Sequence, residues 1–135
     1  MSDSAFLDTN VLIYAIGQRD DRTARADALL AAGGVISVQV LNELASVAHR
    51  KLKMSWPDAA AALDAVKTLC RSPVPLTLAT HEEALRLSAL HQYHIYDALI
   101  IAAALEAECT TLYSEDLQSG QIIDGRLTIR NPFIN

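Results

Sequence analysis

The sequence predicts an α/β fold in which helices flank a mainly parallel central sheet. Short apolar and β-branched runs recur along the chain, and most of them are separated by stretches with helical periodicity. Strands that alternate with helices favour parallel pairing, because the helix returns the chain to the edge where the previous strand began. The length of 135 residues, of which 51% are hydrophobic, fits a single domain over residues 1–135.

The expected strands are short and end at polar or turn-forming residues. The first strand leads directly into Asp8, whose side chain can cap a short helix over 11–14. Pro73 and Pro75 interrupt the chain before the third strand. The five expected strands are residues 5–7, 35–38, 76–78, 110–113 and 127–129.

The longer helices are predicted from apolar residues at helical spacing and from capping residues at their starts. Ser55 can cap the helix that follows it, with Pro57 in the first turn. A capping box is expected over 80–83, where Thr is followed three residues later by Glu. The five longer helices are expected at 23–32, 40–53, 55–70, 80–91 and 95–108.

The charge balance argues against a general nucleic-acid binder. Eleven basic and sixteen acidic side chains give a net charge of −5, whereas phosphate neutralisation requires Lys and Arg. Contact with a nucleic acid would therefore need a local basic patch. Two patches are candidates, one formed by Arg19, Arg22 and Arg25 and the other by residues 49–53, although basic residues also favour the carboxyl end of a helix for electrostatic reasons.

The sequence favours a cytoplasmic protein without membrane contact. Residues 1–8 lack the basic region of a signal peptide, and no apolar run approaches the ~20 residues needed to span a bilayer. Cys70 and Cys109 form no C-x-x-C pair, so we interpret them as small buried hydrophobic residues.

Four carboxylates are expected to converge on one edge of the sheet. Asp8 follows the first strand, and Asp116 lies just after the fourth. Glu43 and Asp97 lie near the starts of two predicted helices. In an open parallel sheet, strand ends and helix starts share an edge, and ligands bind there.

Clustered carboxylates repel one another unless a cation lies between them. Two of them ~4 Å apart repel by about 4 kcal/mol at an effective dielectric constant near 20. Mg²⁺ prefers oxygen ligands and would reverse the sign of this interaction. Each carboxylate also has a structural interpretation: Asp8 and Asp97 can stabilise helix starts, and Glu43 and Asp116 can be solvated surface residues. Position alone leaves both interpretations open.

Four motifs resemble those of PIN-domain proteins, and in particular VapC-type toxins. They occur in the order typical of the family and span nearly the whole chain, from about residue 5 to residue 133. They are Phe6 to Leu12 (FLDTNVL), Leu41-Asn42-Glu43, Tyr96 to Ile100 (YDALI), and Ser114 to Gln118 (SEDLQ) followed by Gly120, Ile123, Gly125 and Asn131-Pro132-Phe133.

The resemblance implies a PIN-like three-layer sandwich and a metal-dependent endoribonuclease. Asp8, Glu43, Asp97 and Asp116 match the family's acidic positions, which bind Mg²⁺ or Mn²⁺ and activate a water that attacks RNA in line. This implies products with 5′-phosphate and 3′-hydroxyl ends. Among the other expected site residues, Ser114 matches a position where the hydroxyl holds a ligand or water. Thr9 and Asn10 match neighbours that orient the first aspartate. Arg50 and Lys51 are candidates for contact with RNA. Glu115 matches no essential position.

The resemblance also implies protein partners. A cognate VapB-type antitoxin would wrap the toxin with its C-terminal segment and cover the acidic pocket, and the toxin would form a homodimer. The apolar helices 40–53 and 55–70 are candidates to frame a groove for the antitoxin, although their apolar faces also suit a core. Trp56 fits either an anchor in this groove or a packing residue at a helix start.

Three other functions compete with an RNA-cleaving toxin. A PIN scaffold without catalysis would serve as an interaction module, but all four acidic positions are retained. A phosphatase or phosphoacceptor with Asp8 as nucleophile lacks the second Asp of a D-x-D motif, since Asn10 occupies that position. A flap-type DNA nuclease would need elements for which this chain has little room.

Overall fold

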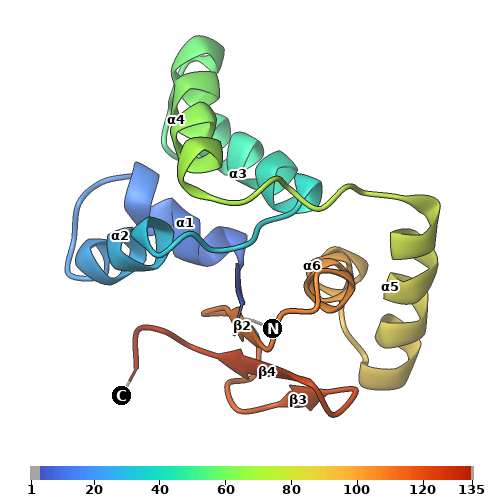
Figure 1. The fold of residues 1–135 in the computed structure, drawn as a ribbon. Helices are drawn as coiled ribbons and strands as arrows, with labels where there is room; N and C mark the ends of the chain where they lie inside the picture. The colour runs from blue at the N-terminus through green and yellow to red at the C-terminus, as the bar shows by residue number, and fades with distance from the viewer. Residues whose placement is uncertain (1–3, 135) are drawn as a thin grey trace.

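The protein is described by a computed structural model over residues 4–134, in which ten elements follow one another along the chain (Figure 1). Residues 1–3 lie outside the described range. They belong to the segment 1–8, for which no signal peptide is predicted from the sequence. The elements are β1 (Ala5–Leu7), α1 (Thr9–Ile16), α2 (Thr23–Ala31), α3 (Val38–Arg50), α4 (Trp56–Leu69), α5 (Leu78–His91), α6 (Ile95–Glu106), β2 (Thr111–Tyr113), β3 (Ile122–Ile123) and β4 (Leu127–Arg130).

The four described strands form one sheet in the order β1-β2-β4-β3. β1, β2 and β4 pair in parallel, and β3 adds an antiparallel edge. Helices α1 and α2 lie on one side of β1, α5 and α6 lie on the other, and α3 and α4 project as a pair (Figure 1). This confirms the predicted α/β sandwich with a mainly parallel sheet.

Helix α6 supplies much of the core. Every residue from Ala98 to Leu105 is buried, so this part of the helix has no solvated face. The strands contribute fully buried side chains from their centres, namely Phe6, Leu112 and Ile129. A helix that is apolar all round is buried on all sides, and α6 therefore fixes Asp97, in its first turn, relative to the sheet.

The predicted strand at 35–38 is wrong as a regular strand. Val35 forms a single parallel bridge with Phe6, and the Leu7 amide donates to the Val35 carbonyl at 2.9 Å. A second single bridge joins Ser37 to Val74, and no regular strand forms because Ser37 caps α3, its hydroxyl accepting a hydrogen bond from the Val40 amide at 3.2 Å. The helix consequently begins at Val38, two residues earlier than expected.

The predicted strand at 76–78 and the predicted capping box at 80–83 are also wrong. Thr77 is the N-cap of α5, and its hydroxyl accepts from the Thr80 amide while the Thr80 hydroxyl accepts from the Thr77 amide. The box therefore lies three residues earlier than expected. The extended residue is Val74, which bridges Ser37.

Strand β3 was not predicted. It pairs with β4 through a turn in which Asp124 and Gly125 both have positive φ angles, of 51° and 69°. The remaining helix boundaries differ from the expected ones by a few residues. Within residues 4–134, no helix is both long and apolar enough to cross a membrane.

Candidate metal centre

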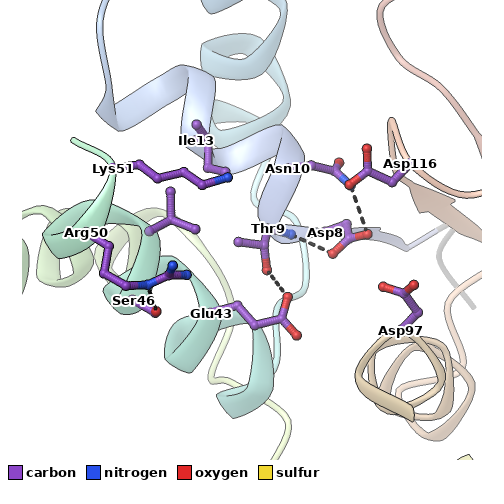
Figure 2. A pocket seen from close by; sticks show the side chains of 11 residues that line it. Asp8, Thr9, Asn10, Ile13, Glu43, Ser46, Arg50, Lys51, Asp97 and Asp116 are labelled. Atoms are coloured by element: carbon purple, nitrogen blue, oxygen red, sulfur yellow. Dashed lines mark hydrogen bonds between the residues drawn. The ribbon is translucent and has the colours of Figure 1, made fainter. Parts of the chain in front are cut away.

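One cavity of about 310 Å³ is lined by all four predicted carboxylates, together with Thr9, Asn10, Arg50 and Lys51 (Figure 2). Asp8 lies between β1 and α1, Glu43 in the second turn of α3, Asp97 in the first turn of α6 and Asp116 in the loop after β2. Asp8 and Asp116, which are more than 100 positions apart in the sequence, thus line the same cavity.

Parallel pairing of β1 and β2 explains why Asp8 and Ser114 are neighbours. Leu7 lies opposite Tyr113 in the register, so the next residue of each strand leaves the sheet at the same edge. The Asp8 amide continues the ladder by donating to the Tyr113 carbonyl at 3.0 Å. The carboxyl ends of the strands therefore define the floor of the cavity, as predicted.

Asp8 is held by three donors. Its side chain accepts hydrogen bonds from the Thr9 amide at 2.7 Å, the Ser114 hydroxyl at 2.8 Å and the Asn10 side-chain amide at 3.3 Å. Only 4% of the residue is exposed. Asp8 caps α1 as well as facing the cavity, so its structural and functional interpretations are compatible.

Burial raises the pKa of Asp8 from 3.8 to about 7. The hydrogen bonds from Ser114 and Thr9 oppose this rise, whereas the nearby charges of Glu43 and Asp97 add to it. Burial likewise raises the pKa of the half-buried Asp97, with His94 opposing the rise and Asp116 adding to it. The cavity is therefore short of positive charge beside its carboxylates.

Glu43 is positioned from both sides. One carboxylate oxygen accepts from the Thr9 hydroxyl at 3.1 Å, and the other accepts from the Gln39 side-chain amide at 3.0 Å. Gln39 was not among the residues predicted for the site, and it is buried despite its polarity. Its contact with Glu43 could have been predicted from the sequence, because Gln39 lies one helical turn before Glu43 and side chains four residues apart on a helix are neighbours.

The loop after β2 separates two adjacent acidic residues. Asp116 is exposed and lines the cavity, and its amide donates to the Ser114 hydroxyl at 3.3 Å. Glu115 instead accepts from the Tyr14 hydroxyl at 2.6 Å and pairs with Arg22 at 3.0 Å. The structure thus places Glu115 outside the carboxylate cluster, consistent with its omission from the expected site.

Asn10 joins the helix start to this loop. Its side-chain amide donates to the Ser114 hydroxyl at 3.2 Å, and its side-chain oxygen accepts from the Glu115 amide at 2.9 Å. Thr9 links Asp8 to Glu43 in the same way, through its backbone amide and its hydroxyl. Thr9 and Asn10 therefore both donate hydrogen bonds to Asp8, and Thr9 also donates one to Glu43.

The two basic patches differ in their access to the cavity. Arg50 and Lys51 line it on the side away from Asp97 and Asp116 (Figure 2). Within the arginine patch, Arg19 pairs with Asp27 at 2.7 Å, Arg22 pairs with Glu115, and Arg25 lies over the Tyr113 ring. None of these three arginines lines the cavity, but Arg22 and Arg25 line a separate hollow, and contact of this patch with RNA stays a prediction.

The donor set fits a hard divalent cation. The four side chains are carboxylates, with no Cys or His among them, and such oxygen donors suit Mg²⁺ or Mn²⁺. A cation would also favour the ionised form of Asp8, whose pKa burial raises. Among residues 4–134, no group of three or more His, Cys, Asp or Glu side chains is placed so that it could hold a metal ion by itself. Mg²⁺ tolerates this, because it usually keeps several waters.

The sheet order, the acidic cavity at the strand ends and the D-T-N sequence at the start of α1 agree with a known class of protein. It belongs to the PIN-domain family, whose profile matches residues 5–121. Comparison with curated proteins gives no significant match.

Solved structures with the same fold include two toxin–antitoxin complexes. The toxin–antitoxin complex from Klebsiella pneumoniae matches with a TM-score of 0.72 at 20% identity, covering 96% of this chain and 98% of that one. VapBC2 from Rickettsia felis, bound to a DNA fragment from its promoter, matches with a TM-score of 0.68 at 24% identity, covering 94% and 97%.

A toxin structure without a named partner is also similar. The VapC20 toxin of Mycobacterium tuberculosis, described as cleaving the sarcin–ricin loop, matches with a TM-score of 0.69 at 24% identity, covering 84% of this chain and 90% of that one. At these identities the likeness establishes the shared fold.

Proposed function

We propose that this protein is a metal-dependent endoribonuclease that acts as the toxin of a toxin–antitoxin pair. The observation that carries the proposal is the single cavity in which Asp8, Glu43, Asp97 and Asp116 face one another. The PIN-domain family and the fold shared with VapC toxins support the same conclusion.

Asp8, Asp97 and Asp116 would hold Mg²⁺ or Mn²⁺, assisted by Glu43. The chemistry that such an ion supplies when bound is activation of a water and stabilisation of the departing 3′ oxygen of a phosphodiester. The protein's own contribution is positional: Thr9, Asn10 and Ser114 fix Asp8, and Gln39 fixes Glu43. Arg50 and Lys51 would bind RNA phosphates at the rim of the cavity.

The proposed protein partner is a VapB-type antitoxin. Two structural neighbours are toxin–antitoxin complexes, which supports such a partner here. A hollow of about 270 Å³ between α3 and α4, lined by Ala45, Trp56 and Leu63 among others, is a candidate docking groove. Trp56 stacks on His49 with ring centroids 3.8 Å apart and remains 59% exposed, so it can both staple the helix start and anchor a partner. The expected homodimer and cytoplasmic location remain proposals that rest on the family resemblance and the sequence.

The decisive experiment is cleavage of RNA by purified, antitoxin-free protein with Mg²⁺ or Mn²⁺ and with EDTA. Asp8→Asn and Asp97→Asn keep the size of the side chain and remove its charge. Cleavage should require the metal and should fall by at least about 100-fold in each variant, given the several kcal/mol that a metal supplies to charge stabilisation. Glu82→Gln, on the exposed surface of α5, is a matched control expected to cleave normally.

The chemistry of the product ends provides a second test. In-line attack by water leaves a 5′-phosphate and a 3′-hydroxyl, whereas attack by the ribose 2′-hydroxyl leaves a 2′,3′-cyclic phosphate. End-labelling that finds cyclic phosphates would overturn the mechanism. Absence of cleavage by folded protein on every RNA tested would favour the interaction module instead.

A further inference from the structure

A second hollow adjoins the carboxylate cavity. Its volume is about 470 Å³, and it shares Glu43, Ser46 and Asp97 with the cavity. Beyond these residues it is lined by Gln39, Asn42, His94 and Tyr96. A substrate whose phosphate lies among the carboxylates would therefore have a neighbouring group within reach of this second hollow.

Tyr96 is the prominent side chain of this hollow. It precedes Asp97 in α6, it is 57% exposed, and it does not belong to the side chains that pack against the core. Its ring lies 5.1 Å from that of His94, measured between centroids, at an angle of 46°. The Tyr96 amide also donates to His94 Nδ1 at 3.2 Å, which restrains the imidazole. An aromatic surface thus stands open to solvent beside a carboxylate of the site.

Asn42 provides hydrogen-bonding capacity in the same hollow. It is exposed, and it comes immediately before Glu43 on α3. Its side-chain amide makes no hydrogen bond to any residue in the described range 4–134. One donor group and one acceptor group are therefore available to the edge of a planar ligand.

We propose that this hollow is a nucleobase subsite, in which a base next to the cleaved phosphate stacks on Tyr96 and is contacted at its edge by Asn42. The inference rests on the proposed RNA-cleaving function and names how that site binds single-stranded RNA. Unstacked bases are recognised in this way, by aromatic stacking and by hydrogen bonds to their edges. Stacking also supplies affinity without positive charge, which suits a protein with a net charge of −5.

The first test compares Tyr96→Ala and Tyr96→Phe on two RNA oligonucleotides of the same sequence, one intact and one abasic beside the cleavage site. Loss of one base–aromatic stack weakens binding by about 5-fold to 150-fold. Tyr96→Ala should therefore lower kcat/KM on the intact oligonucleotide by roughly tenfold, mainly through KM. Phe should retain activity, and only the Ala variant should cleave both oligonucleotides equally well.

Trp56→Ala is the matched control for this comparison. Trp56 is an equally exposed aromatic residue, but it lines a different hollow. Its replacement should preserve the preference for the intact oligonucleotide. Thermal unfolding of each variant checks that the fold is retained. A folded Tyr96→Ala variant that matches the wild type on both oligonucleotides would overturn the subsite while leaving the nuclease proposal intact.

The second test reads binding without activity. Trp56 is the only tryptophan, so Trp56→Phe combined with Tyr96→Trp places a single fluorophore in the hollow. In an Asp8→Asn background, the intact oligonucleotide should quench its fluorescence and the abasic one should quench it less. RNA binding that is detected by anisotropy but causes no quenching would exclude stacking at this position. As a control, an antitoxin peptide that binds in the hollow between α3 and α4 is not expected to quench the fluorescence. Absence of any RNA binding would overturn the subsite and the proposed function together.

Discussion

The Ser114 hydroxyl donates a hydrogen bond of 2.8 Å to Asp8, although the two residues lie 106 positions apart. The same oxygen accepts from Asn10 and from the amides of Asp116 and Leu117. Ser114 is fully buried. One hydroxyl therefore orients the carboxylate at the end of β1 and shapes the loop that carries Asp116.

Replacing Ser114 with Ala should impair both activity and its pH dependence. The hydrogen bond from Ser114 lowers the pKa of Asp8, so its loss should raise that pKa further and move the acidic limb of the kcat/KM profile to higher pH. Residues that orient metal ligands are typically worth about 10-fold to 100-fold in activity or metal affinity. The measurement is a pH–rate profile at fixed Mg²⁺.

A matched control separates this effect from a general loss of stability. Ser88 is another serine with a buried hydroxyl, and that hydroxyl has no hydrogen-bond partner among the described residues. Ser88→Ala should leave the pH profile unchanged. An unshifted profile in folded Ser114→Ala would contradict the assigned role of the hydroxyl.

The metal-free protein should lose stability as the pH rises from about 4 to about 7. Burial raises the folded-state pKa of Asp8 from 3.8 to about 7, so the folded state binds the proton more tightly than the unfolded state does. Ionisation of Asp8 therefore lowers the free energy of unfolding as the pH rises between these two pKa values. The total loss is about 4 kcal/mol if the whole pKa shift is realised. Asp97, whose pKa is also raised, acts in the same direction.

Asp8→Asn is the variant that isolates this cost. It cannot ionise, so its free energy of unfolding should exceed that of the wild type by an amount that grows between pH 4 and pH 8. Denaturant unfolding in EDTA at several pH values measures the difference. Parallel stability profiles for the two proteins would show that Asp8 ionises in the folded state without penalty.

The convergence of the carboxylates was predictable because it follows from chain direction. Asp8 comes straight after a buried strand, and Asp97 opens a buried helix. In a parallel sheet such positions share an edge whatever the details of packing. That Arg50 and Lys51 also line the cavity was not predicted from the sequence, and their contact with RNA stays a prediction.

The features that sequence reasoning missed depend on local competition between hydrogen bonds. The β-branched residues of 35–38 and the alternating Leu-Thr-Leu of 76–78 indicate strands, but Ser37 and Thr77 form caps that start helices instead. The Gln39 contact to Glu43 requires knowing which face of α3 is buried. The pairing of Arg22 with Glu115 joins distant segments and has no periodic signal in the sequence.

The two neighbouring acidic residues after β2 should behave differently. Asp116→Asn removes a carboxylate from the cavity and should lower metal-dependent cleavage by at least about tenfold, with a weaker apparent affinity for Mg²⁺. Glu115→Gln retains an acceptor for Tyr14 and weakens only the partly exposed pair with Arg22, so activity should stay within about threefold of wild type. Metal titrations of cleavage rate for both variants make the comparison. Equal losses would mean that loop position, rather than metal binding, explains the role of Asp116.

Replacing Arg50 and Lys51 together with Ala should weaken RNA binding and reduce its dependence on salt. For single strands, each phosphate contact contributes about 0.7 to the slope of log K against log salt, so loss of two contacts should reduce the slope by up to about 1.4. The measurement is fluorescence anisotropy of an RNA oligonucleotide, in an Asp8→Asn background, over a series of salt concentrations. Lys67→Ala with Arg126→Ala removes the same charge from exposed positions outside the cavity and should leave the slope nearly unchanged. Equal slopes for the two double variants would show that net charge, and not the rim of the cavity, governs RNA binding.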